Sequence, residues 1–174
     1  MGNADSKERT PVEGSGLILF SSDHSKLLLV RDANYKKYGF PKGKHEEIDA
    51  SELETATREC KEETGLDAED YIVFPGSFRL GKYSYRYATL IGDSSTKVLK
   101  KGPNSEIHSL LWVSLDTLLR GETPKEMEFN MPLRFWISDI RHEPTSQASQ
   151  LYRTYLEKRA RKRTQTRRRN RRRN

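Results

Sequence analysis

Carboxylates that could take part in catalysis are concentrated in one short stretch of the sequence. The thirty residues from Tyr38 to Asp67, "YGFPKGKHEEIDASELETATRECKEETGLD", contain nine Asp or Glu residues. On a helix, Glu59, Glu62 and Glu63 would share one arc, because residues three and four positions apart are neighbours there. Like charges at these spacings destabilise a helix unless a positive charge lies among them. A hard divalent cation would supply it, since Mg²⁺ binds carboxylates together with substrate phosphates. A solvated helix face with interleaved basic residues is the alternative interpretation.

The local pattern predicts the helix and the loop that must position these carboxylates. Ser51 followed three residues later by Glu54 is a capping box, which predicts a helix that begins there and ends at Gly65. A glycine-rich loop from Gly39 to Asp49 leads directly into this helix. At about 100° per residue, the stripe that faces the core is expected to comprise Leu53, Ala56 and Cys60.

Apolar runs on both sides of this helix predict strands. Gly16 to Phe20 and Lys26 to Asp32 are joined by "SSDHS", which is typical of a hairpin. Further strands are predicted in "YIVFPG", "SFRL", "KYSYRYATLIG" and "IHSLLWVSL", with helices near Pro132 to Ile140 and near Ser146 to Arg161. Strands that are interrupted by one carboxylate-rich helix and followed by helices predict a mixed α/β sandwich.

Length and composition predict one domain in a reducing compartment. With 174 residues, 33% of them hydrophobic, the chain is long enough for one sizeable core. No run approaches the roughly 18 apolar residues that cross a bilayer, and no secretory signal is visible. An intracellular protein, cytoplasmic or nuclear and not secreted, is therefore expected. The single cysteine, Cys60, excludes an internal disulfide and a multi-cysteine zinc site.

Charge divides the chain into a body and a tail. Residues 158–174 contain 11 of the 32 Lys and Arg residues and no acid, which leaves 21 basic against 25 acidic groups in residues 1–157. A flexible segment over residues 1–13, a domain over residues 14–157 and a disordered basic tail over residues 158–174 are expected. The tail should attract RNA or another polyanion, although a merely solubilising role is the alternative. The candidate nucleic-acid-binding residues are Arg167, Arg168, Arg169, Arg171, Arg172 and Arg173.

One motif resembles that of a known family. Gly43 followed by "RECKEETGL" is similar to the Nudix hydrolase signature G-x5-E-x7-R-E-U-x-E-E-x-G-U, in which U is aliphatic. The second half matches at every fixed position. The first half departs from the pattern, because Gly43 and Arg58 are fifteen positions apart instead of fourteen. We interpret this as one inserted residue, with Asp49 or Glu47 supplying the missing carboxylate, which is largely structural in the family.

The resemblance implies a Nudix-type mixed-sheet α/β/α sandwich and an enzyme that cleaves a phosphoric anhydride. Such hydrolases use Mg²⁺ or Mn²⁺ and act on a nucleoside diphosphate linked to another group. Glu59, Glu62 and Glu63 match the metal ligands of the family, and the carbonyl of Gly43 is a further candidate ligand. Arg58 is expected to orient one of these glutamates through a bidentate pair.

Two carboxylates are candidates for the general base. Glu62 is one of them, and Glu106 is the other, because many relatives place a glutamate just before the corresponding strand. His108 is expected to face solvent or a neighbouring strand instead, on the same side as Glu106.

The loop "GFPKGK" is similar to that of the mRNA-decapping Nudix enzymes, which favours the 5′ cap or 5′ polyphosphate of RNA as substrate. Lys42 and Lys44 could contact the phosphate bridge. Tyr83 and Tyr85 could stack on a base, or could simply pack in a half-buried strand.

Two other functions found among Nudix proteins are the alternatives. Decapping enzymes carry a regulatory domain before the Nudix fold, and no such domain is expected in this chain. A dinucleoside polyphosphate or diphosphoinositol polyphosphate hydrolase is therefore the first alternative. A non-catalytic RNA- or nucleotide-binding module is the second, although retention of the three helix glutamates argues against it.

The N-terminus contains a possible lipidation motif. "MGNADSK" fits M-G-x-x-x-[ST], the pattern for N-myristoylation of Gly2, and chance is an equally good explanation. Membrane contact is expected only if Gly2 is modified, with the basic tail as the second signal that stable anchoring requires.

Overall fold

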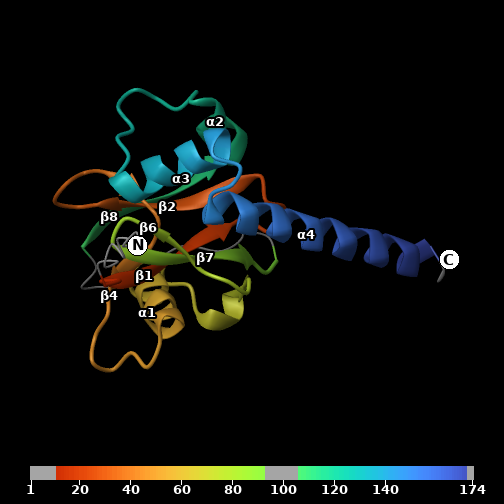
Figure 1. Ribbon diagram of the computed structural model, residues 1–174, viewed down its shortest axis with the longest axis horizontal. Coiled ribbons are helices and arrows are strands. Elements are labelled where there is room, and N and C mark those ends of the chain that lie inside the picture. Colours follow the sequence, from red (N-terminus) through yellow and green to blue (C-terminus); the bar gives the residue numbers. More distant parts are fainter. Residues whose placement is uncertain (1–10, 93–105, 172–174) are drawn as a thin grey trace, which may run out of the picture.

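A mixed β-sheet lies between helices on both of its faces (Figure 1). The computed structural model describes residues 11–92 and 106–171. Its strands are β1 (Gly14–Phe20), β2 (Lys26–Asp32), β3 (Tyr38–Gly39), β4 (Lys42–Lys44), β5 (Tyr71–Val73), β6 (Phe78–Leu80), β7 (Tyr83–Leu90) and β8 (Ile107–Ser114). Its helices are α1 (Glu52–Thr64), the 3₁₀ turn η1 (Ala68–Asp70), α2 (Leu115–Arg120), α3 (Met131–His142) and α4 (Gln147–Arg171).

The hairpin of β1 and β2 opens to admit the loop that precedes α1. The two antiparallel strands pair at Phe20 and Leu27 and then diverge. Further along, β1 pairs with β4, while β2 pairs with β3 on one side and β8 on the other. β7 lies parallel to β1, with β5 and β6 antiparallel to β7. The predicted hairpin and strands are confirmed, and the opening of the hairpin brings β4 close to α1.

Two cores, one on each face of the sheet, explain the layers. Alternate residues of a strand point to opposite faces, and β1 is buried over its whole length. On one face Leu17 and Leu19 pack with Ala56 and Cys60 of α1. On the other face the apolar side chains of β1 and β7 pack with the residues of α3 and α4 that face the sheet, namely Leu133, Trp136, Ala148, Tyr152 and Tyr155. The predicted α/β/α sandwich is confirmed.

α1 has the predicted ends. The Ser51 hydroxyl accepts the N–H of Glu54 at 3.2 Å, and the Glu54 carboxylate accepts the N–H of Ala50 at 2.8 Å. Gly65 ends the helix with φ +73°, a conformation that costs glycine little. The prediction for Leu53 was wrong, since its side chain is 38% exposed and Thr55 is buried instead.

The C-terminal helix extends past Lys158, the position at which the basic tail is expected to begin. α4 is one continuous helix to Arg171, and its later turns extend away from the sheet (Figure 1). Its first turns are anchored, because Tyr152 and Tyr155 are buried against the sheet. Once a helix is nucleated, each added residue costs little, and Arg, Lys, Gln and Ala favour helix. The division into domain and tail at Lys158 stays a prediction.

In the part of the chain that the structure describes, no helix is both long enough and apolar enough to span a membrane.

Candidate active site

One cavity of about 470 Å³ brings together most of the residues that the sequence motif indicates. The side chains and backbone around it come from the end of β2, from β4, from α1, from the start of β7 and from the residue before β8. The lining residues are Asp32, Lys42, Gly43, Lys44, Glu59, Glu62, Glu63, Tyr83 and Glu106. Five carboxylates and two lysines therefore surround one space.

β4 holds two of the α1 glutamates. The backbone N–H of Lys42 donates to a carboxylate oxygen of Glu63 at 3.0 Å. The next residue, Gly43, lies against Glu59, and a Cβ at this position would be 1.9 Å from the Glu59 carboxylate. Position 43 must therefore lack a side chain for Glu59 to lie where it does. The Gly43 carbonyl oxygen approaches Gly14 of β1, and its role as a metal ligand stays a prediction.

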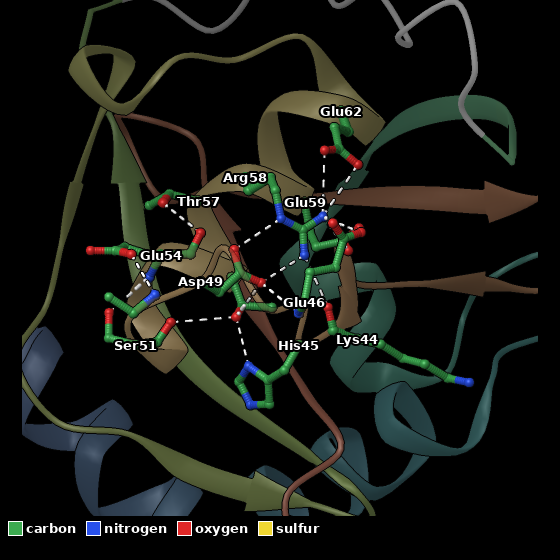
Figure 2. A network of polar contacts seen from close by, with 12 residues as sticks. Lys44, His45, Glu46, Asp49, Ser51, Glu54, Thr57, Arg58, Glu59 and Glu62 are labelled. Atoms are coloured by element: carbon green, nitrogen blue, oxygen red, sulfur yellow. Dashed lines mark hydrogen bonds and ion pairs between the residues drawn. The ribbon is translucent and has the colours of Figure 1, made fainter.

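A bidentate ion pair next to these glutamates holds Arg58 in position. Arg58 donates from Nε and Nη2 to the two carboxylate oxygens of Asp49, at 3.0 and 2.9 Å (Figure 2). The Thr55 hydroxyl also donates to Asp49, at 2.9 Å, and Nδ1 of His45 lies 2.6 Å from that hydroxyl. Hydrogen bonding by Arg58 holds the pKa of Asp49 well below its usual range. Asp49, and not the exposed Glu47, thus takes the place of the first glutamate of the family signature.

The remaining nitrogen of the Arg58 guanidinium, Nη1, contacts two glutamates of the cavity (Figure 2). Its Nη1 donates to Glu59 at 2.9 Å and to Glu62 at 3.4 Å, and Nη2 donates to the Lys44 carbonyl at 2.9 Å. The expected bidentate pair therefore exists, but its partner is Asp49 and not a cavity glutamate. Arg58 orients Glu59 through a single hydrogen bond.

Burial makes ionisation of the two inner glutamates unfavourable. It raises the pKa of Glu63 to about 8, although the N–H and the charge of Lys42 oppose this rise. Burial also raises the pKa of Glu59, against the opposing effect of Arg58. The nearby charges of Arg58 and Lys42 thus offset burial only in part, and a bound cation would favour the charged form of both carboxylates.

The carboxylate oxygens around the cavity are the kind of ligand that a hard divalent cation prefers. Among the described residues, no group of three or more His, Cys, Asp or Glu side chains is arranged to hold a metal ion. Carboxylates from three segments, the end of β2, α1 and the residue before β8, nevertheless line the same cavity, and Glu59 and Glu63 are half-buried there. Mg²⁺ and Mn²⁺ prefer such carboxylate oxygens.

The structure separates the candidate substrate-binding residues. Lys42, Lys44 and Tyr83 line the cavity. The assignment of Tyr85 was wrong, because its side chain is fully buried and packs edge-on against Phe40, with ring centroids 5.7 Å apart. The two tyrosines point to the same face of the sheet, since they are two residues apart, and position along β7 explains the difference. Tyr83 begins the strand and reaches the cavity, whereas Tyr85 lies further along it, within the core.

Both candidate bases remain candidates. The Glu62 side chain is 56% exposed, and Glu106 is exposed at the cavity, with its carbonyl accepting the N–H of Ala33 at 2.8 Å. His108 is exposed and does not line the cavity, as expected.

Sequence reasoning missed Asp32. This residue closes β2 and faces the same cavity, while one of its carboxylate oxygens accepts the N–H groups of Asn34 and Tyr35 at 2.8 and 2.7 Å. An acid at the end of an otherwise apolar strand, next to the glycine-rich loop, was the available signal.

The remaining assignments are not described at the level of side chains. Arg167, Arg168, Arg169 and Arg171 belong to α4. Arg172, Arg173 and Gly2 lie outside the described residues, so RNA binding and myristoylation stay predictions.

The NUDIX domain family matches residues 11–132, which include α1, β4 and the whole cavity. The chain belongs to this family. It is also 26% identical over 160 residues to the mRNA-decapping enzyme subunit 2 and to the m7GpppN-mRNA hydrolase of Saccharomyces cerevisiae. The match covers 87% of this chain and only 16% of each relative. Family membership supports the expectation of a hydrolase.

Solved structures show the same fold. The NUDIX domain of Shewanella oneidensis NrtR, complexed with ADP ribose, gives a TM-score of 0.53 at 19% identity, over 82% of this chain and 95% of that one. A Caenorhabditis elegans Ap4A hydrolase in a binary complex gives 0.51 at 20% identity, over 71% and 93% of the two chains. These similarities concern the Nudix architecture alone.

Proposed function

We propose that this Nudix protein is a metal-dependent pyrophosphohydrolase whose substrate is the 5′ cap or 5′ polyphosphate of RNA. The observation that supports this most is the shared cavity, which Glu59, Glu62, Glu63 and Glu106 line together with Lys42 and Lys44. Carboxylates can hold cations there, and the lysines can attract the phosphate chain that those cations also bind.

Each residue has a definite task in this proposal. Glu59, Glu62 and Glu63, with the Gly43 carbonyl, would hold Mg²⁺ or Mn²⁺, which neutralises phosphate oxygens and lowers the pKa of bound water. Glu62 or Glu106 accepts the proton of the water whose oxygen bonds to phosphorus. The phosphoanhydride P–O bond then breaks, and the leaving phosphate carries away the negative charge. Arg58, held by Asp49, keeps Glu59 in place and does not touch the substrate.

The preference for RNA rests on similarity and charge. The yeast relatives are named as decapping proteins, and the loop "GFPKGK" is part of the matched region. Residues 158–174 add 11 basic side chains without an acid, which suits polyanion binding by counterion release. An intracellular protein that meets RNA is the corresponding proposal for location.

A smaller phosphate-rich substrate is the second candidate. Tyr83 is the single aromatic residue around the described cavity, so two rings that could sandwich a base are not found there. Dinucleoside polyphosphates and diphosphoinositol polyphosphates would fit a cavity that contacts phosphates more than bases.

A substrate panel tests the proposal. Capped RNA, 5′-triphosphate RNA, diadenosine tetraphosphate, a nucleotide sugar and a diphosphoinositol phosphate are each incubated with the protein in Mg²⁺ or Mn²⁺, and in excess chelator. Products are separated by ion-exchange chromatography. We expect metal-dependent release of a nucleoside phosphate from capped RNA, or of phosphate or pyrophosphate from 5′-triphosphate RNA; turnover of the small substrates alone would favour the second candidate. Binding that is indifferent to chelator, with no turnover of any substrate, would instead indicate a non-catalytic module.

A further inference from the structure

Lys42 and Tyr83 belong to strands on opposite sides of β1, yet their side chains meet. Lys42 of β4 pairs with Gly16, and Tyr83 of β7 pairs with Gly14. Neighbouring strands lie roughly 4.8 Å apart, so β4 and β7 are separated by about twice that distance. The Lys42 ammonium nevertheless lies 4.5 Å from the centroid of the Tyr83 ring. The lysine side chain therefore reaches across β1.

A missing side chain on β1 makes this contact possible. A Cβ on Gly16 would lie 2.4 Å from the carbonyl oxygen of Pro41, 2.7 Å from the Cβ of Lys42 and 2.9 Å from the ring of Tyr85. Real Cβ atoms do not tolerate such distances, so any other residue at position 16 would displace the segment of Pro41 and Lys42 from its place beside β1. The aliphatic part of Lys42 instead lies over bare backbone and ends on the Tyr83 ring.

The backbone of Lys42 is fixed at the same time, by the hydrogen bond from its N–H to Glu63 at 3.0 Å. Lys42 thus joins the carboxylate side of the cavity to its aromatic side. Tyr83 is half-buried, and it packs against the core between the sheet and the C-terminal helices. With an ammonium on one side and the core on another, its ring has little free surface on which a base could stack.

We propose that Tyr83 is a positioning residue, which holds the Lys42 ammonium at the cavity for the phosphate chain of the substrate. The inference rests on the proposed function and specifies it: this part of the site recognises linear polyphosphate through Lys42, and Tyr83 does not stack on a base. A cation over an aromatic face is held by the ring quadrupole. The charge is thereby placed before the substrate arrives, which reduces the ordering cost of binding.

Inorganic tripolyphosphate tests this directly, because it has phosphates and no base. Its Kd is measured by titration calorimetry in Mg²⁺ for the wild type and for Lys42→Met, Tyr83→Leu, Tyr83→Phe and the double variant Lys42→Met/Tyr83→Leu. We expect Tyr83→Leu to weaken binding about threefold to tenfold, the range for loss of one cation–π contact. Lys42→Met should weaken binding at least as much, and the double variant no more than Lys42→Met alone. Tyr83→Phe, which keeps the ring, should restore tight binding.

Thermal melting of each variant shows that the fold is intact, and Tyr83→Met replaces Tyr83→Leu if the latter does not fold. Three results would overturn the inference: no binding of tripolyphosphate by the wild type, an unchanged Kd in Tyr83→Leu, or effects of the two substitutions that add in the double variant. A base-stacking role for Tyr83 predicts the second of these. Failure of the proposed function would appear separately, as absence of turnover in the substrate panel, which does not enter the Kd.

Discussion

At the scale of single residues, Glu63 carries the clearest electrostatic signature. Its pKa is raised from 4.5 to about 8 because the carboxyl group is buried. The folded protein thus holds this proton more tightly than the unfolded chain does. The resulting stability is complete below about pH 4.5 and is lost as the pH rises through about 8.

For the metal-free protein, we predict that the free energy of unfolding falls from mildly acidic to mildly alkaline pH, on the order of 3 kcal/mol. Glu63→Gln should flatten most of this fall, since an amide does not titrate. Urea unfolding across the pH range, in chelator, measures both profiles. Coinciding profiles for the wild type and Glu63→Gln would show that Glu63 is not the buried acid described here. Ionised Asp49 also contributes to the free energy of unfolding, and this contribution is lost only in far more acidic solution, because the pKa of Asp49 is lowered.

Asp49 and Glu47 provide a matched pair for testing the support behind the glutamates. Asp49→Asn removes the charge that holds Arg58, so Glu59 loses its orientation. Substitutions of this supporting kind typically cost about 10- to 100-fold in metal affinity or activity. Glu47→Gln, two positions earlier and exposed, should behave as the wild type. Mn²⁺ affinity and kcat/KM of the two variants decide the matter, and equal losses would contradict the assignment of Asp49.

Among these residues, spacing along one helix predicted the grouping of Glu59, Glu62 and Glu63. Spacing could not choose between Asp49 and Glu47, because the choice depends on how the inserted residue bends the loop. It also failed for Tyr85, which packs against Phe40 and Phe78, because such packing between separate segments is not visible in the pattern of one strand.

At the scale of elements, β4 can lie close to α1 because the residue at position 43 is glycine and has no side chain. Gly43→Ala would place a methyl group 1.9 Å from the present position of the Glu59 carboxylate. Glu59 must then move, and we predict weaker Mn²⁺ binding and lower activity with little change in thermal stability. In a Glu59→Ala background the same Gly43→Ala substitution should have no further effect. An additional loss in that background would mean that Gly43 acts through something other than Glu59.

Element boundaries were predictable where the signal is local. Ser51, Glu54 and Gly65 define the ends of α1 by their own hydrogen bonds and backbone angles. The end of α4 was not predictable from its charge, because the helix begins on aromatic residues docked to the sheet and continues into the basic segment. The short helix α2, capped by Ser114 and Gly121, was not predicted as a separate element.

At the scale of the whole molecule, the cavity and the far end of α4 are separate parts. Among the α4 residues up to Arg161, whose side chains the structure describes, Tyr155 is the last buried one, and Arg159 still contacts the carbonyl of Asp23. Removing residues 162–174, with eight Lys or Arg residues, should therefore leave folding and turnover of a small dinucleotide unchanged. Affinity for long RNA should fall at low salt, and its dependence on salt should become shallower.

The matched control for this truncation replaces the same eight basic residues by Gln and keeps the length. Both variants should weaken RNA binding alike in filter-binding assays across a salt series. RNA affinity equal to that of the full chain would remove the electrostatic reason for preferring RNA. Lost turnover of the dinucleotide would mean that this segment also supports the cavity.

The comparison of Glu63→Gln with Glu69→Gln tests most directly whether the carboxylate-lined cavity is the site of hydrolysis. Both changes replace one carboxylate by an amide, but Glu63 lines the cavity while Glu69 lies exposed on η1, outside its lining. Initial rates are measured in Mg²⁺ on capped RNA and on diadenosine tetraphosphate, with melting temperatures in chelator as the check on folding. We predict that Glu63→Gln lowers hydrolysis by orders of magnitude without loss of stability, and that Glu69→Gln matches the wild type. Near wild-type hydrolysis by a folded Glu63→Gln protein would place the active site elsewhere.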